Sequence, residues 1–163
     1  MPLSGAVPRP GLYEVPVDGS MHWAGVLAMA GANPARVQAL LLGGPSGRFV
    51  LPEEFDRPLE LRALGAGGTV VLGPDADIAQ ITRDLAAYNA RESCGECTPC
   101  REGTPRLVEL LADPVANRTR IDALIEVMTE ASLCQLGGMA GRPVTSALQS
   151  FPDAFARAAR GTG

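Results

Sequence analysis

The sequence predicts an α+β protein, in which a small mixed sheet packed on one helix is followed by a bundle of about four helices. Two observations support this prediction. Short apolar runs bounded by glycine and proline occupy residues 9–73, whereas apolar residues recur at helical spacing after residue 75. The turn-forming sequence Gly73-Pro74-Asp75 separates the two patterns, so we expect one domain at residues 9–73 and a second at residues 75–158.

The first domain is expected to hold short strands and one helix. The run at residues 12–17 contains Pro16, which predicts an edge strand or the end of a strand. Residues 23–30 are apolar without β-branched enrichment and are followed by the turn sequence at 31–34, which predicts a short helix. Further strands are predicted at residues 37–42, 49–51 and 69–72, each next to glycine or proline.

Helical periodicity dominates the second domain. Four apolar stripes predict about four helices. Asp75 or Asp77 is placed to cap the first helix, Asn117 or Thr119 is placed to cap the third, and Pro143 suits the first turn of the fourth. The stripes consist of Ile78, Ile81, Leu85 and Tyr88; of Leu107, Leu110 and Leu111; of Ile121, Leu124, Ile125 and Met128; and of Val144, Ala147 and Leu148.

Composition argues against several classes of partner and location. The net charge of −4 offers no broad basic surface, so nucleic acid is not expected as the main partner. No apolar run approaches the ~20 residues of a membrane helix, so membrane insertion is not expected. Residues 1–10 lack the pattern of a signal peptide, which makes the cytoplasm the expected location. In a reducing cytoplasm, four cysteines indicate a metal or redox site before they indicate disulfides.

The cysteines form a pattern typical of a [4Fe–4S] cluster site. Cys94, Cys97 and Cys100 make a C-x2-C-x2-C array, and Cys134 follows after 33 intervening residues. Cubane clusters are held by four thiolates, and three cysteines at this spacing can bind three corners of one cube while a distant fourth closes the last corner. We therefore expect these four cysteines to bind one cluster that passes electrons.

A zinc site and a disulfide framework are the alternatives for the same cysteines, and both remain open. A structural zinc site usually pairs two C-x2-C knuckles or uses histidine, but Cys134 has no partner at knuckle spacing and His22 lies in the other domain. A disulfide framework is less favoured, because three cysteines within seven residues pair badly with one another.

The charges near the cysteine array also allow two interpretations. Arg91 and Arg101 flank the array, and a cationic side chain there would favour the more negative, reduced cluster and raise its potential. Alternatively, both arginines form surface ion pairs with the glutamates at positions 92, 96 and 102.

No nucleophile–base constellation is found, so no catalytic residue is expected. His22 beside Trp23 fits a partly buried helix face. The glycine-rich runs at residues 43–47 and 65–68 lack both the lysine of a P-loop and the strand-to-helix setting of G-x-G-x-x-G, so both are predicted to be turns.

Three segments resemble one known family. Residues 92–104 (ESCGECTPCREGT) resemble the cluster loop of the flavoprotein (51 kDa) subunit of respiratory NADH:quinone oxidoreductase, whose relatives include the β subunit of NAD-linked formate dehydrogenases and the diaphorase subunit of NAD-reducing hydrogenases. Residues 132–139 (SLCQLGGM) resemble the second cluster segment of that family and are most similar to the formate dehydrogenase branch. Residues 4–14 are similar to the start of its ubiquitin-like β-grasp (SLBB) domain.

The resemblance implies an SLBB domain followed by a four-helix iron–sulfur domain, with Cys94, Cys97, Cys100 and Cys134 as the ligands. In such subunits a flavin exchanges hydride with NAD(H), and this cluster links the flavin to further iron–sulfur centres. The chain begins after the family's domain for FMN and NADH, so these cofactors are expected on a partner or a missing domain. Whether the chain alone is an enzyme is therefore left open, and it is expected to be part of an NAD-dependent oxidoreductase complex.

The expected partners are thus a flavin- and NAD(H)-binding domain or subunit and other iron–sulfur subunits, with formate favoured over quinone or hydrogen as the associated substrate. Two alternative functions are a zinc-stabilised structural scaffold and a β-grasp module that binds a soluble ligand.

Overall fold

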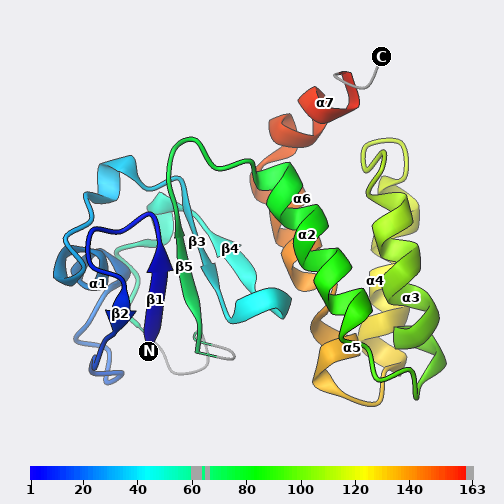
Figure 1. Cartoon of the computed structure of the whole chain (residues 1–163), viewed down its shortest axis with the longest axis horizontal. Coiled ribbons are helices and arrows are strands. Elements are labelled where there is room, and N and C mark those ends of the chain that lie inside the picture. The colour runs from blue at the N-terminus through cyan, green and yellow to red at the C-terminus, as the bar shows by residue number, and fades with distance from the viewer. Residues whose placement is uncertain (60–63, 65–66, 161–163) are drawn as a thin grey trace. The chain divides into compact units, whose positions relative to one another are not determined.

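The computed structural model describes residues 1–59, 64 and 67–160, and it divides into two compact units at residues 1–76 and 77–163 (Figure 1). The first unit begins with a strand at residues 2–5, which the expected domain range of 9–73 omits. Residues 65 and 66 of the second glycine-rich run lie outside the described part of the chain. The described helices are all too short or too polar to cross a bilayer.

The first unit is a five-stranded mixed sheet with one helix. Its strand order is β2-β1-β5-β3-β4, in which only the β1–β5 pair is parallel. Its elements are β1 (Pro2–Gly5), β2 (Gly11–Leu12), α1 (Trp23–Met29), β3 (Ala39–Leu42), β4 (Arg48–Val50) and β5 (Thr69–Leu72), with 3-10 turns η1 (Pro34–Arg36), η2 (Gly44–Ser46) and η3 (Pro52–Glu54) between them.

Helix α1 covers one face of this sheet. Trp23, Val26 and Leu27 of the helix share one buried cluster with Leu40 of β3 and Val71 of β5. The helix predicted at residues 23–30 and the strand predicted at 69–72 are confirmed. The strand predicted at residues 12–17 is wrong over most of its length, because only Gly11–Leu12 pairs with β1.

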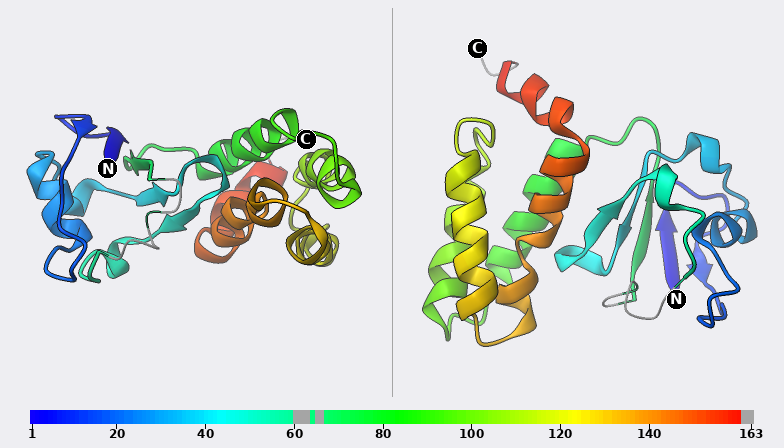
Figure 2. Two further views of the ribbon diagram at one scale, coloured as in Figure 1. Left: turned by 90° about the horizontal axis from the view of Figure 1, so that it is seen from below. Right: turned by 180° about the vertical axis from the view of Figure 1, so that it is seen from behind.

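The second unit is helical. Its elements are α2 (Ile78–Arg91), α3 (Thr98–Leu110), α4 (Arg118–Ala131), α5 (Gln135–Met139), α6 (Arg142–Ser150) and α7 (Pro152–Arg160). Helix α3 packs against α2 and α4, and α6 packs against α2; Figures 1 and 2 show α3 and α4 as adjacent rods. The described residues of this unit thus form six helices instead of about four, because α5 and α7 were not predicted.

The N-cap residues of α2 and α4 make different hydrogen bonds. Asp77 caps α2 as predicted, since its Oδ1 accepts the backbone N–H of Gln80 at 2.9 Å. Asn117 occupies the N-cap position of α4 but does not cap it; its side-chain amide instead donates to the backbone oxygen of Asp113 at 3.0 Å. Asn117 therefore stabilises the preceding turn.

Candidate metal centre

The cysteine array lies at the junction of α2 and α3. Helix α2 ends at Arg91, and Cys97 is the N-cap residue of α3, so Cys100 falls within the first turn of that helix. Gly95 has φ +79°, a left-handed conformation that costs other residues more than glycine. This glycine lets the chain reverse direction between Cys94 and Cys97.

Cys134 reaches the array through the start of α5. It is the N-cap residue of α5, which packs against both α3 and α4. The pKa of the Cys97 thiol is lowered, chiefly by hydrogen bonds from the backbone N–H groups of Leu133 and of Cys100. One sulfur therefore joins the three-cysteine loop to the segment that carries Cys134, although many residues separate them in sequence.

Close packing holds the two segments together. A Cβ atom built on Gly137 of α5 would lie 2.6 Å from the Cβ of Ser132 and 2.9 Å from the Cβ of Cys100. Both distances are shorter than carbon atoms tolerate, so only glycine fits at this position. The neighbouring Gly138 is different, since the nearest atom to its added Cβ is the Thr129 carbonyl oxygen at 3.7 Å.

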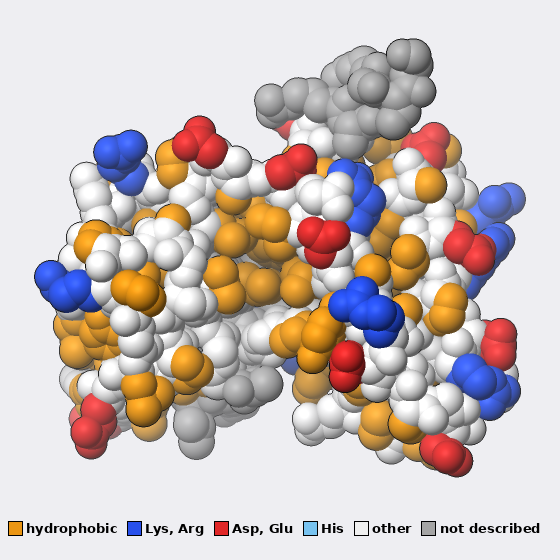
Figure 3. Space-filling view, viewed as in Figure 1, with side chains coloured by type: hydrophobic (Ala, Val, Ile, Leu, Met, Phe, Trp, Pro, Cys, Tyr) orange, Lys and Arg blue, Asp and Glu red, His pale blue; other side chains and the backbone are white. Residues whose placement is uncertain are grey.

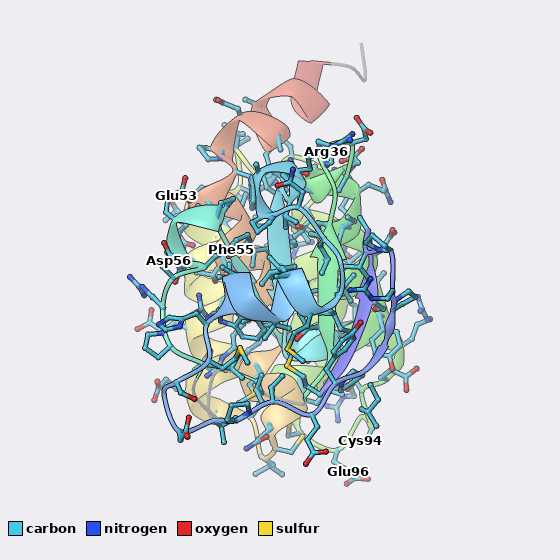
Figure 4. All side chains as sticks on the ribbon, turned by 90° about the vertical axis from the view of Figure 1, so that its left-hand side faces the viewer. Arg36, Glu53, Phe55, Asp56, Cys94 and Glu96 are labelled. Carbon is cyan, nitrogen blue, oxygen red and sulfur yellow. The ribbon has the colours of Figure 1, made fainter. Side chains whose placement is uncertain are left out.

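The four thiols differ in their surroundings. Cys100 is 3% exposed, and burial raises the pKa of its thiol; the charges of Cys97, Cys134 and Cys94 raise this pKa further, while the Ser93 hydroxyl lowers it. Cys94 and Cys134 are exposed, and Figure 4 shows Cys94 and Glu96 together at the lower edge of the helical unit.

The donor set consists of four free thiols, and thiolates are the ligands that hold iron–sulfur clusters. In a cubane cluster each thiolate binds a different iron, whereas on a structural zinc all four would bind one ion. The chemistry of the residues present fits a [4Fe–4S] cluster.

A buried polar atom beside the cysteines supports the same fit. The Ser132 hydroxyl lies close enough to Cys97 to lower the pKa of that thiol slightly, yet its oxygen is buried and has no hydrogen bond of good geometry. A buried hydroxyl without a partner is costly. A sulfur-rich group bound between the two segments would supply the missing acceptor.

Arg101 connects the array to α3. Its guanidinium donates to the Gly95 carbonyl at 2.9 Å and to Thr98 Oγ1 at 3.3 Å, and it pairs with Glu102 at 3.0 Å. Arg91 instead lies over the Tyr88 ring at 5.7 Å from its centroid. The ion pair expected for Arg101 is thus present, but the same side chain also holds the loop between Cys94 and Cys97.

The remaining candidate features lie in the first unit. His22 is the half-buried N-cap residue of α1 and forms a β-bridge with Pro58. Residues 43–47 form the turn η2 between β3 and β4, as predicted. A side chain on Gly47 would collide with the backbone oxygen of Leu42, so this glycine serves a tight turn. Figure 3 shows acidic and basic side chains interspersed on the described part of one face.

Sequence reasoning missed the residues that surround the thiols. Ser93 Oγ lies 3.2 Å from Cys100 Sγ, and the Leu133 N–H contacts the Cys97 sulfur. The available signal was the serine close before each cysteine segment, in Ser93-Cys94 and Ser132-Leu133-Cys134. Neither contact follows from spacing alone, because each joins residues on different turns or segments.

Comparison with known proteins identifies the class of the second unit. Residues 80–158 match the family model described as the NADH-ubiquinone oxidoreductase-F iron-sulfur binding region, so the second unit is similar to that region.

The whole chain has more specific relatives. It is 31% identical to the F subunit of NADH-quinone oxidoreductase from Aquifex aeolicus, over 93% of this chain and 38% of the relative. It is 29% identical to the HndC subunit of the NADP-reducing hydrogenase from Solidesulfovibrio fructosivorans, over 94% of this chain and 34% of the relative. A crystal structure of an NAD⁺-reducing [NiFe]-hydrogenase in the H2-reduced state aligns with TM-score 0.85 and 32% identity, over 96% of this chain and 28% of that one.

These matches make the chain a homologue of NADH-quinone oxidoreductase F subunits and of NAD-reducing hydrogenase subunits. The chain spans about a third of the length of these curated relatives.

Proposed function

We propose that Cys94, Cys97, Cys100 and Cys134 bind one [4Fe–4S] cluster, through which the chain passes electrons between a flavin/NAD(H) site and further iron–sulfur centres. The observation that carries the proposal is the close approach of α5 to Cys100, since a Cβ added to Gly137 would lie 2.9 Å from the Cβ of Cys100. This approach places the segment of the fourth cysteine beside the three-cysteine loop, as shared ligation of one cluster requires.

The residues around the thiols are suited to this role. When bound, such a cluster supplies reversible one-electron storage. The backbone N–H groups of Leu133 and Cys100 stabilise the Cys97 thiolate, which is the form that binds metal. Cys100 is buried and keeps water from one side of the site, while the exposed Cys94 and Cys134 offer the edge at which electrons can enter or leave.

The reaction partners are inferred from the relatives' names. These are subunits of NADH-quinone oxidoreductase and of NAD- or NADP-reducing hydrogenases. We assign FMN and the nicotinamide nucleotide to a partner or an additional domain, and we expect other iron–sulfur subunits beside it. Residues 132–139 still favour a formate dehydrogenase complex. Free thiols of this kind suit a reducing compartment, and we propose the cytoplasm.

The first unit is proposed to be an SLBB-type β-grasp domain that serves as a docking spacer. Its support is the strand order β2-β1-β5-β3-β4, with a parallel β1–β5 pair and α1 following β2. The second unit is proposed to be a four-helix bundle of α2, α3, α4 and α6, extended by α5 and α7. The packing of α3 on α2 and α4, and of α6 on α2, supports this assignment.

Metal analysis and EPR spectroscopy test the cluster. Protein purified without oxygen is expected to contain about four irons per chain and to give a signal on reduction with dithionite. Cys134→Ala is expected to lose both, whereas Ser150→Ala, a matched control on the end of α6 next to α7, is expected to keep both. One zinc per chain without an EPR signal would contradict the proposal and favour a structural scaffold.

A further inference from the structure

The hydroxyl of Ser93 is placed against the most buried of the four thiols. Ser93 is half-buried, and its Oγ lies 3.2 Å from the Sγ of Cys100, whose residue is 3% exposed. The serine belongs to the segment between α2 and α3, whereas Cys100 lies in the first turn of α3. The contact thus reaches across the loop that carries Cys94 and Cys97.

The donor in this hydrogen bond can be assigned. The backbone N–H of Gly95 donates to the same Ser93 oxygen at 3.4 Å, so that oxygen already accepts one hydrogen bond. A metal-bound cysteine is a thiolate and has no proton to give. The Ser93 hydroxyl proton is therefore directed to the Cys100 sulfur in the loaded protein.

We infer that Ser93 is a positioning residue that sets the reduction potential of the cluster by donating this hydrogen bond to Cys100. The inference rests on the proposed function. Reduction adds one electron to the bound cluster without forming or breaking a bond to the protein. The added negative charge is shared by the thiolates, so a donor aimed at one of them stabilises the reduced form more than the oxidised form.

Because Cys100 is buried, a hydrogen bond to its sulfur affects the cluster potential more than a hydrogen bond to an exposed cysteine would. Water can hydrogen-bond to the exposed Cys94 and Cys134 and can replace a lost protein donor there. At the buried Cys100, no such replacement is at hand, and hydrogen bonds are stronger in the lower local dielectric. Removing the Ser93 hydroxyl is thus expected to lower the potential measurably.

Potentiometric titration followed by EPR tests the inference on the full chain loaded with iron, with dithionite as the reductant. Ser93→Ala is expected to lower the equilibrium constant for reduction about tenfold, which is a shift of about 59 mV to more negative potential for one electron. Ser93→Thr keeps the hydroxyl and is expected to stay close to the parent protein. Ser150→Ala removes a half-buried serine hydroxyl on α6 and is the matched control, expected to leave the potential unchanged.

Each outcome separates this inference from the proposed function. Four irons per chain with an unchanged potential in Ser93→Ala would overturn the inference and leave the proposed function intact. A Ser93→Thr shift as large as that of Ser93→Ala would also overturn it, because packing and not the hydroxyl would then be responsible. Failure of Ser93→Ala to retain iron would assign the serine to cluster binding instead, and absence of iron from the parent protein would overturn both proposals.

Discussion

Substitution of Gly137 by alanine tests whether α5 must approach the cysteine array as closely as the structure indicates. The added Cβ would lie 2.6 Å from the Cβ of Ser132 and 2.9 Å from the Cβ of Cys100. Both neighbours are the first side-chain carbons of their residues, so rotation about χ1 cannot move them away. The backbone of α5 or of α3 has to shift instead.

The size of the effect follows from two opposing contributions. Overpacking of this kind costs about 1–3 kcal/mol. Replacing glycine by alanine inside a helix contributes up to about 1 kcal/mol in the other direction. The net expectation for Gly137→Ala is a loss of about 0–2 kcal/mol in the free energy of unfolding, together with reduced iron retention.

Gly138→Ala is the matched control, because it is the adjacent position of the same helix. Its added Cβ meets nothing closer than 3.7 Å, so only the helix preference changes and the variant is expected to be neutral or slightly more stable. Urea unfolding of the three proteins and iron per chain after purification are the measurements. Equal stability and equal iron content of the two variants would refute the proposed close approach of α5 to Cys100.

Three further predictions concern the surroundings of the array. Asp77→Ala removes the cap on the Gln80 N–H and is expected to cost about 1 kcal/mol in urea unfolding, whereas Asp75→Ala is expected to cost little. Gly95→Ala is expected to cost about 1–2 kcal/mol, since φ is +79° and the added Cβ meets nothing within 4 Å; a cost near zero would show that the loop can adopt another conformation. In iron-free protein, Cys100 is expected to be alkylated more slowly than Cys97 at neutral pH, because the raised pKa of Cys100 leaves less thiolate and the lowered pKa of Cys97 leaves more. Mass spectrometry of the labelled peptides at several pH values measures both rates. Faster labelling of Cys100 would contradict its burial in the first turn of α3.

The sequence indicated those elements whose signals are local. Strand β5 has glycine on both sides and β-branched residues within, and α1 ends where a turn sequence begins, so both were predicted close to their true bounds. Strand β1 was missed, because Pro2 and Gly5 weaken its pattern and its partner β5 lies more than sixty residues away. Pairing at that distance depends on the tertiary fold and leaves little trace in a short window of sequence.

In the helical unit, too, features with local sequence signals were predicted, whereas features that depend on tertiary contacts were not. The cap at Asp77 was predicted correctly because the backbone N–H that donates to its side chain lies only three residues away, at Gln80. Helix α5 was missed because Gly137 and Gly138 oppose helix formation. The presence of glycine at position 137 is explained only by its close contact with Cys100 in the folded structure. For the site, the cysteine spacing predicts the ligand set, but the hydrogen bonds of Ser93 and Leu133 to sulfur depend on how two segments pack.

The separation of Cys100 from Cys134 has a consequence for the mechanical integrity of the helical unit. Most of α3 and all of α4 lie between these two cysteines, so a cluster bound to both would close a covalent ring with 33 intervening residues that include this helical pair. By analogy with a disulfide of that loop length, such a cross-link would lower the entropy of the unfolded chain by an amount worth about 3–4 kcal/mol. Oxidative loss of the cluster would then cut the ring, and α3 and α4 would become the first part of the unit to open to proteases.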